Sequence, residues 1–117
     1  MEKETGIFLA LLRELQKIDP EFPLQYAVCL GEIALEEGLS LTALSEKTGM
    51  PLSTVSRIIG ALSQKRQKGV PYDLVTVTVS AHERRKKELY LTQGGRAVIG
   101  ALAATMTNGQ KDRRLRA

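Results

Sequence analysis

Short polar side chains and one long cation stand close together just after Pro51: Ser53, Thr54, Ser56 and Arg57. Each hydroxyl group can donate and accept a hydrogen bond, and a guanidinium offers a fixed fork of donors. If this segment is a helix that buries its apolar side, these polar side chains point outward. A helix that enters the major groove of DNA presents such a face near its N-terminus, so the chemistry indicated here is hydrogen-bonded recognition.

Residues 41–62, LTALSEKTGMPLSTVSRIIGAL, predict the two helices that would position this face. Gly49 stands where the first helix must end in left-handed backbone, which glycine accepts without a Cβ clash. Pro51 suits the entry to the second helix, because its missing N–H would be unpaired in the first turn anyway. The apolar residues that recur at helical spacing, and that we expect in one small core, are Leu41, Leu44, Val55, Ile58, Ile59 and Leu62. Two helices around a tight turn are typical of the helix-turn-helix motif, although an ordinary helical hairpin would show the same spacing.

A pair of strands is predicted after the second helix. Gly69 and Pro71 are stop signals for that helix. Residues 74–79 (LVTVTV) are β-branched and alternating, which predicts a first strand, and residues 87–91 (KELYL) predict a second. The connection between the strands, residues 80–86, is polar and charged. We therefore expect a mostly α fold with a small β-hairpin wing: a winged helix-turn-helix flanked by N- and C-terminal dimerisation helices.

On these motifs, residues 24–102 resemble the MarR family of bacterial transcription regulators. In that family the wing carries an acidic residue followed by arginines, and a Leu-Thr-x-x-Gly motif comes a few residues later. Residues 83–85 (Glu-Arg-Arg) and 91–95 (Leu-Thr-Gln-Gly-Gly) hold those places here. This chain departs from the family in three ways: a glutamate replaces the usual aspartate, residues 62–69 add about one helical turn, and less helix follows the wing.

Charge is distributed unevenly along the 117 residues. Residues 1–50 hold four Lys or Arg against nine Asp or Glu, whereas residues 51–117 hold thirteen against four, so the two parts carry −5 and +9. The basic part contains the predicted recognition helix and wing, as expected of a surface that binds phosphates. We expect residues 1–107 to form a single winged-helix domain with its terminal helices, and residues 108–117 to form a basic tail that frays or adds a phosphate contact.

The remaining helices are expected to form a dimeric scaffold. Thr5 can cap a first helix, residues 24–37 predict a second that ends at Gly38, and Thr92 can cap a last one. The last helix is apolar on nearly all sides as far as Met106, so it needs cover from a second subunit unless it folds back onto its own core. The predicted dimer interface consists of Phe8, Leu11, Leu12, Leu15, Ile99, Leu102 and Met106.

Enzymatic, metal-binding and membrane functions are not indicated. The single histidine, His82, has no evident catalytic partner, and the chain has no GxGxxG, phosphate-loop or paired-cysteine motif. One His and one Cys do not make a zinc site, and no cofactor is expected. Cys29 lies among apolar residues and is expected to be a structural thiol rather than a redox sensor. The chain has neither an apolar run of about 18 residues nor a secretory start, and one cysteine suits a reducing cytoplasm.

The sequence thus predicts a regulator, most simply a repressor, that binds an inverted-repeat operator in double-stranded DNA as a homodimer. The predicted DNA contacts are Leu52, Ser53, Thr54, Ser56, Arg57, Lys65, Arg66, Lys68, His82, Arg84, Arg85 and Lys86. Among them, Arg57 is expected to pair with guanine, and Arg84 or Arg85 to enter the flanking minor groove. The resemblance allows a small-molecule effector, which no residue identifies.

Two other classes stay open at this point. One is a plasmid or phage replication or partition protein built on a winged helix, which would bind DNA at an origin or at repeated sites. The other is a winged helix used for protein–protein contact without DNA.

Overall fold

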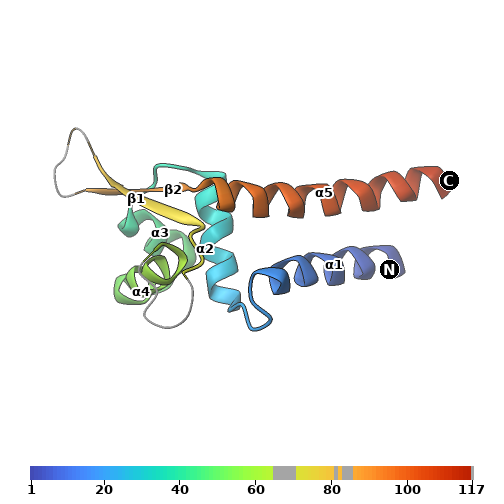
Figure 1. Cartoon of the computed structure of the whole chain (residues 1–117), viewed down its shortest axis with the longest axis horizontal. Helices are drawn as coiled ribbons and strands as arrows, with labels where there is room; N and C mark the ends of the chain where they lie inside the picture. Colours follow the sequence, from blue (N-terminus) through green and yellow to red (C-terminus); the bar gives the residue numbers. More distant parts are fainter. Residues whose placement is uncertain (65–70, 81, 83–85, 117) are drawn as a thin grey trace. The chain divides into compact units, whose positions relative to one another are not determined.

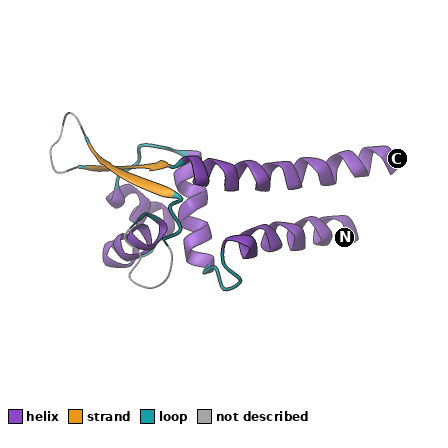
Figure 2. Cartoon of the chain, viewed as in Figure 1, coloured by secondary structure: helices purple, strands orange, loops and turns teal. Residues whose placement is uncertain are grey.

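The computed structural model describes residues 1–64, 71–80, 82 and 86–116, and of residues 108–116 only the backbone. Within these residues the elements follow in the order α1 (Glu2–Ile18), α2 (Leu24–Leu35), α3 (Leu41–Thr48), α4 (Leu52–Leu62), β1 (Val75–Val79), β2 (Lys87–Leu91) and α5 (Gln93–Arg116) (Figure 1). Figure 2 shows the strands as one hairpin in a largely helical chain. The predicted winged helix-turn-helix with flanking helices is confirmed.

The chain divides into two compact units. Pro23–Arg96 form one, which we call the winged-helix lobe, and Met1–Phe22 with Ala97–Ala117 form the other, which we call the terminal unit. None of the described helices is both long and apolar enough to cross a membrane.

The winged-helix lobe contains the apolar core. Its fully buried side chains come from α2, α3, α4 and both strands, and the largest are Leu30, Ile33, Leu44, Ile58, Leu62 and Leu89. All four apolar residues predicted on the inner side of α4 are buried, at 3% exposure or less. Each such side chain contributes about 1.5–3 kcal/mol by leaving water, so this face fixes how α4 is rotated.

Local hydrogen bonds define the turn between α3 and α4. Gly49 has φ of 74° and ends α3 in the left-handed region, as predicted. The Ser45 hydroxyl donates to the carbonyl of Met50 at 2.7 Å, and the Met50 N–H donates to Thr48 Oγ1 at 3.3 Å. Pro51 is the residue just before α4, so its missing N–H leaves no helical hydrogen bond unmade.

Strand β2 is paired on both sides. On one side it runs antiparallel to β1, with Val75 opposite Leu91 and Val79 opposite Lys87. On the other side the Gly38 N–H donates to the carbonyl of Leu89 at 2.7 Å, and the Leu89 N–H donates to the carbonyl of Leu39 at 3.0 Å. The connection between α2 and α3 is therefore bonded to the hairpin.

The first turn of α5 is held against the start of β1. Thr92 caps the helix as predicted, because its Oγ1 accepts the Gly95 N–H at 3.0 Å. The same hydroxyl donates to the carbonyl of Asp73 at 2.6 Å, and the Thr92 N–H donates to the carbonyl of Leu74 at 3.0 Å. A Cβ on Gly95 would overlap that Leu74 oxygen. This contact gives a physical reason for the Leu-Thr-x-x-Gly pattern.

The bounds of three helices, α1, α2 and α5, differ in part from the predictions. Helix α1 begins at Glu2, with Met1 in the cap position and no side-chain cap, so the prediction that Thr5 caps it is wrong. The Thr5 N–H instead donates to the carbonyl of Met1 at 2.9 Å, inside the first turn. Helix α2 ends at Leu35, before the predicted residue 37. Helix α5 continues past Met106 to Arg116, where the sequence predicted a tail.

Candidate nucleic-acid interface

The polar side of α4 is exposed. Ser53, Ser56 and Arg57 are exposed, Leu52 is 49% exposed, and Thr54 is half-buried. Burial of the apolar stripe on the other side causes this orientation, since side chains on one helix divide between its two faces. The residues chosen from sequence for base recognition therefore share an accessible surface.

A groove of about 620 Å³ lies between α4 and β1. Buried Ile59 and Val75 contribute apolar lining, while Ser56, Ser63 and Thr76 contribute hydroxyl groups. Lys87, at the start of β2, adds a cation. A ligand in this groove would contact the polar side of the second motif helix and the wing strand at once.

Several of these groove residues were missed at the sequence level. Ser63, Gln64, Thr76 and Lys87 were not predicted to be functional, although all four line the groove with Ser56. The alternation of Val and Thr along β1 could not have identified Thr76, because its neighbours Val75 and Val77 line the groove as well.

The described residues between the two strands of the wing are polar, and His82 and Lys86 among them are exposed. The His82 N–H donates to Ser80 Oγ at 3.2 Å, and the Ser80 N–H donates to the carbonyl of Lys86 at 2.8 Å. The side chains of His82, Lys86 and Lys87 are all exposed. The predicted contacts Lys65, Arg66, Lys68, Arg84 and Arg85 lie outside the described residues.

Ion pairs lie near the C-terminal end of α2. Glu36 pairs with Lys47 of α3 at 3.0 Å, and this partner raises the pKa of Lys47. Glu37 pairs with Arg96 at 2.9 Å. In the part of the chain that the structure describes, Arg57 and Lys87 make no such pair, so their charges are available to a polyanion.

Cys29 is fully buried in α2. Burial, with a smaller effect from the nearby Glu32 carboxylate, raises the pKa of its thiol to about 11. The thiol is therefore protonated at neutral pH and lacks the thiolate that reactive cysteines present. Among the described residues, no three His, Cys, Asp or Glu side chains are grouped so that they could hold a metal ion.

Known proteins share this architecture. A model of the IclR helix-turn-helix domain matches residues 33–66, which include α3 and α4. The structure of the MepR–DNA complex of S. aureus superposes with a TM-score of 0.76 at 17% identity, over 97% of this chain and 86% of that one.

Two further structures are similar over less of their own length. MarR family transcription regulator SP03579 gives a TM-score of 0.67 at 19% identity, over 92% of this chain and 65% of that one. PcaV from Streptomyces coelicolor, in complex with its natural ligand, gives a TM-score of 0.61 at 18% identity, over 83% of this chain and 64% of that one. No curated protein matches the sequence. The fold is thus that of MarR-type transcription regulators, as the sequence motifs predicted.

Proposed function

We propose that this protein is a MarR-type regulator that binds specific sites in double-stranded DNA and has no enzymatic activity. The observation that carries the proposal is the shared groove: exposed Ser56 of α4 and exposed Thr76 of the wing strand border one surface in a fold that, in MepR, is found with DNA. A duplex on this surface would meet α4 in its major groove and the wing beside it.

Each part of the surface has a distinct role in this proposal. Ser53, Thr54 and Arg57 read base edges, with Arg57 bonded in bidentate fashion to guanine. Ser56 holds a phosphate, and we add Thr76 and Lys87 as further contacts to the same sugar–phosphate strand, since the groove lies between α4 and β1.

The wing is proposed to extend the contact with the backbone. His82 and Lys86 are exposed beside the hairpin and would contact phosphates. Arg84 or Arg85 would enter the flanking minor groove, where Arg side chains bind most favourably. These last two residues, like the predicted phosphate contacts before β1, are proposed on sequence alone.

A homodimer would complete the regulator. Exposed apolar side chains are present on the terminal unit, where Phe8 is 61% exposed and Met106 49%. Leu9 and Leu12, on α1, are also exposed at 47% and 36%. Exposed apolar side chains favour association, and a two-fold dimer would bind an inverted repeat with half-sites about 10 bp apart. Occupancy of such an operator in the cytoplasm would block transcription, making the protein a repressor.

Selection of bound sequences from a random duplex pool tests the DNA-binding proposal. We expect an inverted repeat to emerge. Arg57→Ala should then weaken binding to that repeat by about 1–3 kcal/mol and relax base choice at one position. Arg13→Ala is the matched control, because it removes the same charge from an exposed site on α1. Equal losses on every sequence would contradict base recognition by Arg57.

The same selection separates the other classes. A direct-repeat array would favour a replication or partition protein. A complete lack of binding to random duplex at low salt would favour a winged helix that contacts proteins. A small-molecule effector, suggested by the liganded PcaV structure, would appear as a compound that changes operator affinity.

Sedimentation tests the dimer separately. Phe8→Glu should convert the protein to a monomer, because a carboxylate in an apolar interface is left without water or a partner. Leu35→Glu is the control, since Leu35 is 84% exposed but lies on α2 in the winged-helix lobe. A Phe8→Glu protein that still sediments as a dimer would refute the interface assignment.

A further inference from the structure

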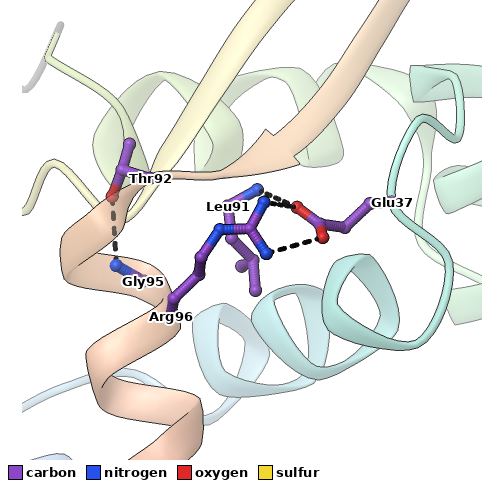
Figure 3. Close-up of polar contacts among 5 residues, drawn as sticks. All are labelled: Glu37, Leu91, Thr92, Gly95 and Arg96. Carbon is purple, nitrogen blue, oxygen red and sulfur yellow. Dashed lines mark hydrogen bonds and ion pairs between the residues drawn. The ribbon is translucent and has the colours of Figure 1, made fainter.

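Glu37 joins three segments at the base of α5. Its Oε2 accepts a hydrogen bond from Arg96 Nη1 at 2.9 Å, and its Oε1 accepts one from Arg96 Nη2 at 2.9 Å. Oε1 also accepts the backbone N–H of Leu91 at 2.9 Å. Figure 3 shows both carboxylate oxygens engaged, with Arg96 reaching back from the helix to Glu37. The contact thus connects the end of α2, the end of β2 and the first turn of α5.

The geometry of this contact constrains the orientation of Arg96 relative to Glu37 more than it stabilises the folded protein. Exposed ion pairs contribute little to folding, and the side chains of Glu37 and Arg96 are 27% and 58% exposed. A planar carboxylate facing a planar guanidinium through two parallel bonds nevertheless permits few relative orientations. The third bond, from a strand N–H, fixes the carboxylate itself.

Two separate sets of contacts therefore hold the first turn of α5. Thr92 and Gly95 lie against Asp73 and Leu74, the two residues just before β1. Arg96 is tied to Glu37 and, through it, to the end of β2. Two attachments to different elements prevent rotation about either one.

The chain leaves the winged-helix lobe directly after Arg96. The terminal unit resumes at Ala97, inside an unbroken helix, while the other connection between the units is the peptide between Phe22 and Pro23. Helix α5 has 24 residues and is about 36 Å long at 1.5 Å per residue. A tilt of about 10° at its first turn would displace its far end by about 6 Å. A small change in the orientation of α5 at Arg96 therefore becomes a large displacement at its C-terminal end.

We propose that Glu37 is a positioning residue: by holding Arg96 and the Leu91 N–H it sets the direction of α5, and thereby the separation of the two α4 helices in the dimer. It thus determines which half-site spacing the regulator accepts. This inference rests on the proposed function. The residue acts through α5 and does not itself touch DNA.

Binding to operators of altered spacing tests the consequence for DNA. The wild type should lose affinity by at least about tenfold when one or two base pairs are added between half-sites, because the half-sites rotate around the duplex. Glu37→Gln should bind the best spacing more weakly and lose most of this discrimination, while its affinity for a single half-site stays the same. Arg96→Lys should behave similarly, since it keeps the charge but loses the fork.

Glu36→Gln is the matched control. It neutralises the neighbouring residue and breaks the pair with Lys47, which joins α2 to α3 and does not involve α5. Its spacing preference should equal that of the wild type. Wild-type discrimination in Glu37→Gln would overturn the inference, even if all the proteins bind DNA.

A second measurement needs no DNA. Spin labels at Thr42 on α3 and Thr107 on α5, both exposed, report the distance between the lobe and the far part of the helix. Buried Cys29 is left in place. Glu37→Gln should broaden this distance distribution by about 3 Å, because a tilt of about 10° acts on the roughly 17 Å of helix between Arg96 and Thr107. An unchanged distribution overturns the inference, whereas a broadened one without DNA binding by the wild type rejects only the proposed function.

Discussion

Replacing Gly95 with alanine should destabilise the protein, although the same change in most helices does the opposite. Gly95 is buried in the first turn of α5. A Cβ there would overlap the Leu74 carbonyl oxygen and lie 3.1 Å from its carbon and 3.3 Å from Leu91 Cδ2. The oxygen cannot move away freely, because it accepts the Thr92 N–H and belongs to the backbone that leads into β1.

The size of the effect follows from opposing contributions. Overpacking costs about 1–3 kcal/mol, and loss of the bond between Thr92 and Leu74 adds about 1 kcal/mol. Alanine recovers about 0.5–1 kcal/mol of helix propensity. The net expectation is a loss of about 1–3 kcal/mol in the free energy of unfolding. In a chain of this size each kcal/mol shifts Tm by about 3–5 °C.

Gly31→Ala is the matched control for this substitution. Gly31 lies in α2, in the same lobe, and a Cβ there would meet nothing within 4 Å. It should stabilise the protein by about 0.5–1 kcal/mol. Urea denaturation of both variants at equal protein concentration measures the difference. If Gly95→Ala were as stable as Gly31→Ala, the close approach of α5 to β1 would not exist in the protein.

Three further results are expected. Thr92→Val should lower the free energy of unfolding by about 1 kcal/mol in urea denaturation, because it removes the helix cap. Thr42→Val, at an exposed site in α3, should lower it less, and equal losses would contradict the capping role. The Cys29 thiol should react with a disulfide reagent about 100-fold more slowly in the folded than in the unfolded protein, since its pKa rises from 9.0 to about 11; equal rates would refute its burial. The Leu91 N–H and then Arg96 lower the pKa of Glu37, so its contribution to stability exists above its unfolded pKa and is lost as the pH falls through the lower folded value. The difference in unfolding free energy between wild type and Glu37→Gln should therefore vanish in acid, and a difference that persists there would need another cause.

Local sequence signals were sufficient for the helix-turn-helix. The positive φ of Gly49, the buried stripe of α4 and the Thr92 cap each depend on residues within one or two turns, so spacing and residue type predicted them. The cap at Thr5 failed because a helix can begin earlier without a side-chain cap. Glu2 and Glu4 in the first turn of α1 complement its dipole, which favours the earlier start.

Contacts between distant segments were beyond such reasoning. Glu37 and Arg96 are 59 positions apart, and neither stands in a pattern that identifies the other. The groove between α4 and β1 likewise depends on how the hairpin packs, so Thr76 and Lys87 became candidates only in the folded chain. Sequence periodicity gives the face a residue occupies, but the partner on that face depends on tertiary packing.

The bonded connection between α2 and α3 restricts how this protein can change in evolution. Gly38 and Leu39 pair with Leu89, and Leu39 is itself only 6% exposed. A single inserted residue there would shift the pairing and turn Leu39 towards water, since neighbouring strand residues face opposite sides. Insertions and deletions among related proteins should therefore be rare at this short connection. A protein with an insertion there would need different hydrogen bonds to β2.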